Sequence, residues 1–153
     1  MIFEMIIHFI CRGNAFRSRM AESYLNSLGI DDLRAISSGT VAELHSGSNK
    51  ANFLITQSVL EQHGLKKYTK DHWDQLTKQR LLEGDLTIFL NKNVAKECQR
   101  LFGLPSNFMV WDIPDFDEIT PIPTTKTEIH AFTERTFRLI KSNVNDLSKN
   151  LLE

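Results

Sequence analysis

The sequence has few cysteines, almost no excess charge and no long apolar segment, and each shortage excludes a class of protein. Its 153 residues contain two cysteines, Cys11 and Cys98, which are too few for a disulfide scaffold and are typical of a reducing compartment. Lys and Arg number 18 against 19 Asp and Glu, and this balance argues against a broad nucleic-acid-binding face. The apolar segment 1–10 is shorter than the ~20 residues that cross a bilayer. We therefore expect a cytoplasmic protein that binds neither nucleic acid nor membrane.

Motifs for metals and nucleotides are missing as well. Histidines, cysteines and carboxylates show no metal-ligand spacing, and no glycine-rich nucleotide motif occurs. There is no internal repeat, no low-complexity tract and no linker between domains. Because a chain of this length is the usual size of one domain, we expect a single domain over residues 1–153, with no cofactor and no metal.

Short apolar runs alternate with helical patterns along the chain. A nearly continuous apolar run at residues 5–10 is typical of a strand covered on both faces, and a second short strand is expected at residues 34–38. Two more short apolar runs lie at residues 86–90 and 108–111. Apolar residues recur at helical spacing near residues 20–28, 51–59, 94–101 and 129–151, and a further short helix is expected from Asp71 to Leu82. Strands that alternate with helices predict an α/β fold with a four-stranded parallel sheet and helices on both faces.

The segment CRGNAFRS, residues 11–18, lies between the first expected strand and the first expected helix. We call it the Cys11 loop. In parallel sheets, ligands bind beyond the carboxyl ends of the strands, and the free N–H groups of a helix N-terminus attract an anion. Gly13 and Asn14 tolerate backbone dihedrals that turn successive amides toward one point. The Cys11 loop therefore predicts an anion-binding site.

Three side chains of this loop indicate covalent chemistry. A thiol at Cys11, in the field of the helix N-terminus, is expected to ionise readily and to attack as a thiolate. Arg17 would bind a tetrahedral oxyanion through two parallel hydrogen bonds, and Ser18 would donate a hydrogen bond to the sulfur. The alternative is that Cys11 is an inert buried residue and Arg17 an exposed helix residue. The combination of residue types and context favours the reactive interpretation.

The stretch IIHFICRGNAFRSRMAE resembles the low-molecular-weight protein tyrosine phosphatases, whose loop has the form C-x-G-N-x-x-R-S followed by x-M-A-E. The similarity continues through the segments SSGT (37–40), DHW (71–73), DLTIFLN (85–91) and DIPD (112–115), so it covers most of the chain. The resemblance implies a flavodoxin-like three-layer α/β/α fold whose parallel strands have the order 2-1-3-4.

The resemblance also implies roles for individual residues. Catalysis would fall to Cys11, Arg17 and a general acid, and the rest of the phosphate-binding loop would be Arg12, Gly13, Asn14, Ala15, Phe16 and Ser18. The acid aligns with Asp115, in a segment that we call the acid loop, residues 112–118. Asp112, Asp117 and Glu118 are competing carboxylates in the same loop. His72 would support the Cys11 loop by a hydrogen bond to Asn14.

This chain departs from the family pattern around the expected cleft. The family commonly has a proline and two aromatic residues after the acid, whereas this chain has Phe116, Asp117 and Glu118. Phe116 would form the aromatic wall, and Leu44 or His45 falls where the family places an aromatic residue that helps to choose substrates. Arg19 replaces a proline, and its charge either offsets the added acids or is simply solvated.

The implied activity is hydrolysis of phosphotyrosine in a protein, or of a small aryl phosphate monoester, through a cysteinyl-phosphate intermediate, with inorganic phosphate as product. An arsenate reductase of the same fold is an alternative, but its thiol relay needs two cysteines that align with Asn91 and Cys98, so one is missing. Cys98 is then simply a core residue. A homologue that binds phosphate without turnover is the other alternative.

Overall fold

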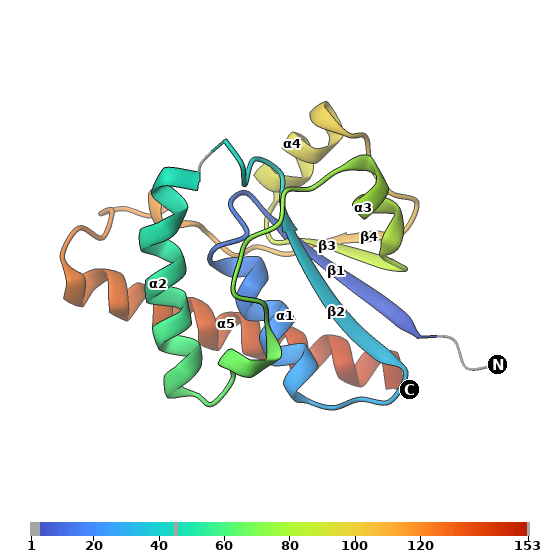
Figure 1. Ribbon diagram of the computed structural model, residues 1–153, viewed down its shortest axis with the longest axis horizontal. Coiled ribbons are helices and arrows are strands. Elements are labelled where there is room, and N and C mark those ends of the chain that lie inside the picture. The colour runs from blue at the N-terminus through green and yellow to red at the C-terminus, as the bar shows by residue number, and fades with distance from the viewer. Residues whose placement is uncertain (1–3, 45, 153) are drawn as a thin grey trace.

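The computed structural model describes residues 4–44 and 46–152, excluding the side chains of residues 46–48. Its centre is a sheet of four parallel strands in the order β2–β1–β3–β4 (Figure 1). The strands are β1 (Met5–Cys11), β2 (Leu33–Gly39), β3 (Leu86–Phe89) and β4 (Phe108–Val110). Both the flavodoxin-like α/β architecture and the strand order expected from the resemblance are confirmed.

Helices cover both faces of this sheet (Figure 1). The first face carries α1 (Arg17–Ser27) and α5 (Lys126–Leu152), with α2 (Ser46–Gln62) packed against both. The second face carries α3 (Lys78–Glu83) and α4 (Lys92–Leu101). Two short 3₁₀ turns complete the described elements, η1 (Lys66–Tyr68) and η2 (Phe116–Glu118).

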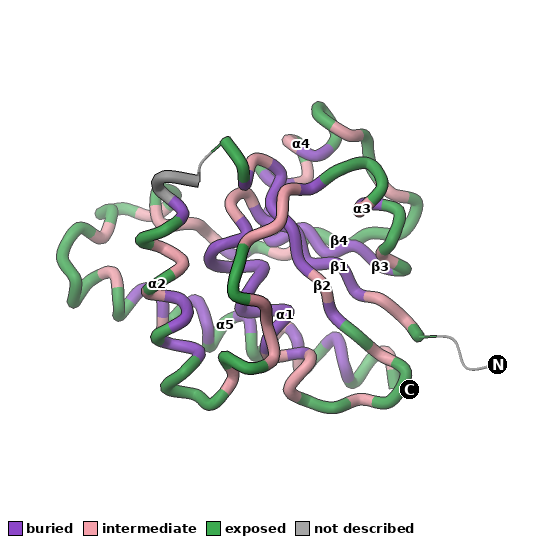
Figure 2. The backbone as a smooth tube through the Cα atoms, in the orientation of Figure 1, coloured by how far each residue is buried: buried purple, intermediate pink, exposed green. Residues whose placement is uncertain are grey.

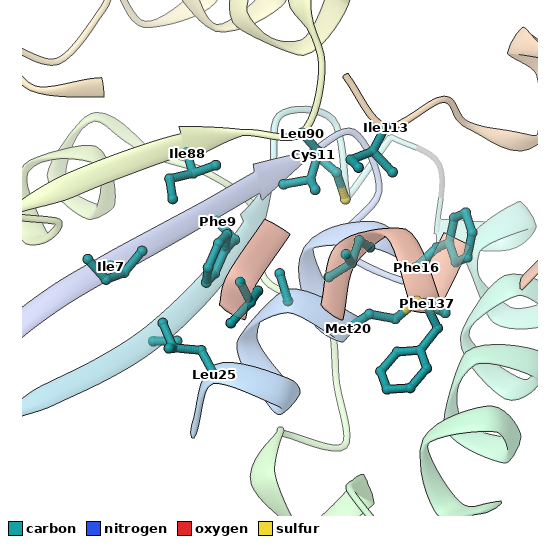
Figure 3. Packing of buried hydrophobic residues seen from close by; sticks show 14 of the residues in the cluster. Ile7, Phe9, Cys11, Phe16, Met20, Leu25, Ile88, Leu90, Ile113 and Phe137 are labelled. Carbon is teal, nitrogen blue, oxygen red and sulfur yellow. The ribbon is translucent and has the colours of Figure 1, made fainter. Parts of the chain in front are cut away.

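Alternation along β1 divides the apolar side chains between two cores. Ile7, Phe9 and Cys11 face the side of α1 and α5, whereas Ile10 faces α3 and α4. Figure 3 shows part of the first core, with Ile7 and Phe9 along β1 and Cys11 at the end of the strand. Burying one large apolar side chain stabilises a fold by about 1.5–3 kcal/mol, so this core fixes the direction of β1 and the position of Cys11.

Burial differs between the central strands and the edge strand β4. The central strands are buried along most of their length, while the outer faces of the helices are exposed (Figure 2). β4, however, is exposed at all three of its residues, with Phe108 40% and Val110 43% exposed. β4 is the edge strand of the sheet, so it is covered only in part although its residues form an apolar run.

The helix expected from Asp71 to Leu82 begins only at Lys78, where the Thr77 hydroxyl caps it by accepting from the Arg80 N–H. Residues 69–76 are extended or irregular because their backbone groups bond to other segments: Gly39 N–H donates to the Asp74 carbonyl, and Leu76 N–H donates to the Gly39 carbonyl. This segment therefore runs beside the end of β2. In the described ranges, no helix is both long and apolar enough to cross a membrane.

Candidate active site

A cleft of about 270 Å³ opens beyond the carboxyl end of β1. It is bounded by three segments: the Cys11 loop, the start of α2, and the acid loop. Its lining residues are Cys11, Arg12, Gly13, Ala15, Phe16, Arg17, Asn49, Asn52, Asp115, Phe116 and Asp117. The cleft thus brings together the expected nucleophile, arginine and acid, which lie up to about a hundred residues apart in the sequence.

Cys11 is 2% exposed, and its sulfur has two polar neighbours from its own loop. The Ser18 Oγ lies 2.9 Å from Cys11 Sγ, and the Asn14 backbone N–H donates to the same sulfur at 3.3 Å. Ser18 Oγ accepts a hydrogen bond from Asn14 Nδ2 at 2.8 Å, so its own hydrogen is left to donate to the sulfur. Two hydrogen-bond donors of the loop are therefore directed at one sulfur atom.

Asn14 fixes the loop in this shape. Its φ of 57° is a left-handed conformation, which asparagine tolerates better than most residues. Its side chain is completely buried, donates to Ser37 Oγ of β2 at 2.8 Å, and accepts from the Asp74 backbone N–H at 2.8 Å. Asn14 therefore ties the Cys11 loop both to β2 and to the segment that precedes α3.

The role expected for His72 is corrected by these contacts. The Asn14 oxygen is taken by the Asp74 backbone, while the His72 ring is 61% exposed and contacts Asp71 at 3.2 Å and Asp74 at 3.3 Å. Only the His72 carbonyl takes part in supporting the loop, as an acceptor for Arg19. The DHW motif marks the correct segment, but a main-chain group does the work that the resemblance assigns to the histidine.

A buried charged group below the loop was not predicted. Glu22 accepts from Ser37 Oγ at 2.8 Å, and Lys70 Nζ donates to Asp74 at 2.6 Å and to the Ser37 carbonyl at 2.7 Å. Burial lowers the pKa of Lys70 from its ordinary value, although Glu22 and Asp74 oppose this shift. Charges this deep persist only when they are paired. The segment KDHWD, residues 70–74, is the one feature of the sequence that could have indicated these paired charges.

Arg19 is a buried structural residue and not a solvated one. Its guanidinium bonds to the carbonyls of Asn14, Lys70 and His72 and lies 4.7 Å from the Phe53 ring. Burial lowers its pKa from the ordinary value, against the opposing charge of Glu22. Arg19 therefore clamps the helix end of the Cys11 loop and is turned away from the cleft.

Arg17 joins the Cys11 loop to the acid loop. Its side chain is 1% exposed; Nη1 donates to the Ile113 carbonyl at 2.8 Å, and Nη2 donates to Asp115 Oδ2 at 3.1 Å. The carboxylate of Glu118 lies 3.9 Å from Nη1. The arginine and the acid that the resemblance assigned to catalysis are thus in direct contact.

The walls of the cleft differ partly from the prediction. Phe116 lines the cleft as expected, with its ring 4.5 Å from that of Phe16. Leu44 is 79% exposed and does not line the cleft, and His45 lies outside the described residues. Asn49 and Asn52 of α2 take that wall, because successive turns of a helix present residues on one side.

Asn49 also explains the glycine in the Cys11 loop. Its side-chain amide donates to the Gly13 carbonyl at 2.8 Å and to the Ala42 carbonyl at 3.3 Å. A Cβ at Gly13 would collide with the Asn49 oxygen, so a larger residue there would push the Asn49 side chain away from the carbonyls that it bonds. The two residues are 36 positions apart, and no motif in the sequence indicated that they are in contact.

Cys98 lies in the second core, completely buried, and its thiol donates to the Gly103 carbonyl at 3.3 Å. The prediction that it faces the core is confirmed. The sheet separates it from Cys11, which belongs to the first core. Asn91, at the position where a thiol relay would need its first cysteine, caps α4 by accepting from the Val94 N–H at 3.0 Å.

The two thiols should therefore differ in reactivity at neutral pH. Burial raises the pKa of Cys98 to about 11, so its unreactive thiol form persists until the pH approaches that value. Iodoacetate at pH 7 is expected to alkylate Cys11 alone in the native protein and both cysteines after denaturation, as peptide mass spectrometry would report. Equal labelling of the two residues in the native state would contradict this assignment.

The chain is similar to a known protein family in sequence and to solved structures in fold. A family model described as low molecular weight phosphotyrosine protein phosphatase matches residues 6–153. Among solved structures, Wzb of Vibrio vulnificus in complex with benzylphosphonate is similar with a TM-score of 0.71 and 19% identity, covering 95% of this chain and 98% of that chain. No curated protein matches the chain in sequence.

Two further structures have the same fold. A low molecular weight protein tyrosine phosphatase from Streptococcus pyogenes is 21% identical, with a TM-score of 0.70 over 97% of this chain and 94% of that chain. The YwlE arginine phosphatase from Geobacillus stearothermophilus is 19% identical, with a TM-score of 0.66 over 97% and 95%. The family model spans nearly the whole chain, from the second residue of β1 to the last residue of the sequence. This chain therefore belongs to the low molecular weight phosphotyrosine protein phosphatase family.

Proposed function

We propose that this protein is a cysteine-dependent phosphatase that hydrolyses phosphotyrosine in proteins and small aryl phosphate monoesters. The observation that carries the proposal is the Cys11 sulfur, held between the Ser18 hydroxyl and the Asn14 N–H in a cleft that also contains Arg17 and Asp115. This set supplies a nucleophile, an oxyanion ligand and a proton donor within one site.

Substrate binding uses the charge of Arg17. In the free enzyme, the guanidinium bonds to Asp115 at 3.1 Å. A phosphate dianion that enters the cleft replaces Asp115 as the partner of Arg17, and it receives further hydrogen bonds from the loop amides. A carboxyl group beside a dianion is favoured in its protonated form. Asp115 then holds the proton that the leaving oxygen needs.

The reaction proceeds in two displacements. The Cys11 thiolate attacks phosphorus, the bond from phosphorus to the phenolic oxygen breaks, and Asp115 donates its proton to that oxygen. Water then attacks the cysteinyl-phosphate while Asp115 accepts the water proton, and the sulfur–phosphorus bond breaks. The thiolate that leaves is stabilised by Ser18 and Asn14, and inorganic phosphate is released.

An aryl leaving group fits the aromatic side of the cleft. The Phe116 ring lines it and is packed against Phe16, which is 4% exposed, and against Phe132, whose ring is 5.0 Å from that of Phe116. A substrate ring can stack on a face that is already held in place. A related structure was solved with benzylphosphonate, which carries an aromatic ring, whereas another relative is an arginine phosphatase. The test therefore includes both aryl phosphate and phosphoarginine substrates.

The proposal is tested by trapping the intermediate. The protein is mixed with p-nitrophenyl phosphate, released phosphate is measured, and acid-quenched samples are digested and analysed by mass spectrometry. We expect turnover with phosphate bound to the Cys11 peptide, and faster cleavage of a phosphotyrosine peptide than of matched phosphoserine or phosphoarginine peptides. Binding of phosphate without turnover would instead favour a binding protein, and arsenate-dependent oxidation of thioredoxin would favour a reductase.

A further inference from the structure

We propose that Glu118 is a positioning residue that holds Asp115 and Arg17 in register for proton transfer to the leaving group. The inference rests on the proposed function, because it concerns the same reaction. It assigns a role to an acid that departs from the aromatic residues common in the family. Three segments of the chain converge on this one carboxylate.

The first contact is with the acid itself. Glu118 Oε1 accepts from the Asp115 backbone N–H at 2.8 Å, while Asp115 Oδ1 accepts from the Phe116 N–H at 2.9 Å. The two acids form a reciprocal capping box around the turn η2. The backbone of Asp115 is thereby fixed, and one carboxylate oxygen is committed to the turn. The other oxygen, Oδ2, is the one directed at Arg17.

The second contact attaches the turn to the sheet. Asn91 Nδ2 donates to Glu118 Oε1 at 2.9 Å, and Asn93 Nδ2 donates to Oε2 at 2.7 Å. Asn91 is 6% exposed and is itself fixed as the cap of α4. The acid loop has no strand or long helix of its own. This pair of amides joins η2 to the carboxyl end of β3, next to the Ile113 N–H, which donates to the Leu90 carbonyl at 2.9 Å.

The third contact is electrostatic. Glu118 Oε1 lies 3.9 Å from Arg17 Nη1, on the guanidinium nitrogen that also bonds to the Ile113 carbonyl. When a phosphate takes Nη2 from Asp115, Glu118 and the Ile113 carbonyl still hold Nη1 and keep the fork aimed at the cleft. Burial opposes the charge of Glu118, but hydrogen bonds from Asp115 and Asn93 and the charge of Arg17 outweigh it and lower its pKa.

These contacts give Glu118 two effects that a passive loop residue would lack. It sets the distance of Asp115 from the leaving oxygen. It also restrains Arg17 once the hydrogen bond between Arg17 and Asp115 has broken. Asp117 of the same turn lines the cleft and forms no hydrogen bond or ion pair with other described residues. The two added acids of the loop therefore differ in position: Glu118 bonds to groups of the protein, whereas Asp117 faces the cleft where the substrate binds.

The test compares esters that differ in their need for an acid. Phenolate is a poor leaving group and requires protonation, whereas p-nitrophenolate leaves readily without it. We expect Glu118→Ala to lower kcat/KM, which reports the step that expels the leaving group, by about 100-fold on phenyl phosphate and by less than about 10-fold on p-nitrophenyl phosphate, which is within the range of general acid catalysis. Asp115→Asn should give the same pattern with a larger loss.

Conservative variants separate positioning from folding. Glu118→Gln keeps an acceptor for the Asp115 N–H but loses the charge, so it should recover part of the activity on phenyl phosphate. Asn93→Ala removes one anchor and should show a smaller form of the same selectivity. The matched control is Glu134→Gln, which alters an acid on α5 that contacts His63 at 3.1 Å away from the cleft, and it should leave both rates unchanged. Inhibition by inorganic phosphate reports that the Cys11 loop remains intact.

The outcomes distinguish this inference from the proposed function. Equal losses on the two esters in both Glu118 variants, or no loss in either, would overturn the positioning role while leaving the phosphatase assignment standing. A wild-type protein that hydrolyses neither ester would overturn the proposed function and this role with it. A selective loss on phenyl phosphate with retained phosphate inhibition supports the inference.

Discussion

Replacing Cys11 with serine is expected to reduce turnover of p-nitrophenyl phosphate by about 10⁴-fold or more, because a hydroxyl does not ionise near neutral pH as a thiol does. The donors from Ser18 and Asn14, at 2.9 and 3.3 Å, stabilise a sulfur anion and cannot compensate for an oxygen that keeps its proton. The loop amides and Arg17 are unchanged by this substitution. Binding of inorganic phosphate should therefore persist.

The measurement is kcat for the aryl ester together with the Kd for inorganic phosphate, obtained by calorimetry. Cys98→Ala is the matched control, since it removes the other thiol from a core on the opposite face of the sheet. That variant is expected to retain turnover and to lose only a little stability. Substantial activity in Cys11→Ser, or a comparable loss in the Cys98 variant, would overturn Cys11 as the nucleophile.

The parts of the site that could be predicted from the sequence are those whose residues lie close together along the chain. The Cys11 loop joins a buried strand to a helix, and eight adjacent residues contain the sulfur, its hydrogen-bond donor Ser18 and the arginine. Their relative positions follow from local backbone geometry, so sequence and structure agree. The parallel sheet was equally predictable, because apolar runs and helical patterns alternate along the chain.

The parts that were mispredicted depend on contacts between distant segments. His72 was expected to bond to Asn14, but the neighbouring Asp74 N–H occupies the Asn14 oxygen at 2.8 Å. A backbone donor carries no side-chain signature, so no motif could reveal it. Leu44 was placed in the cleft by alignment, whereas the direction of α2 brings Asn49 there instead.

Buried charge was the least visible feature in the sequence. Lys70 and Glu22 look like ordinary surface residues in the sequence. Only the folded chain shows that Glu22 is buried and that the Lys70 side chain is largely withdrawn from water. Their pairing is favourable only after β2, α1 and the 69–76 segment have come together, because an unpaired charge there would be costly. The energetic reason for their presence therefore lies in tertiary structure and not in any local pattern.

The second large effect is expected from Arg17→Lys, which should lower kcat/KM for p-nitrophenyl phosphate by about 10³-fold although the charge is conserved. The Arg17 guanidinium is 1% exposed and bonds simultaneously to the Ile113 carbonyl and to Asp115. Lysine places one compact ammonium group on a flexible stem, and it cannot reproduce two parallel hydrogen bonds to a phosphate. The loss should be greater in kcat than in phosphate affinity, since the planar fork matches the equatorial oxygens of the transition state.

Kinetics on wild type and Arg17→Lys, with the Kd for inorganic phosphate, measure these two effects separately. Arg34→Lys is the control for the same chemical change at an exposed site, where the arginine contacts Glu4 at 2.7 Å, and it should behave like wild type. If Arg17→Lys lost phosphate binding and kcat to the same degree, the guanidinium would act as a simple charge. If it lost neither, Arg17 would be a structural link between the Cys11 loop and the acid loop, and its bond to Asp115 would be the reason for its burial.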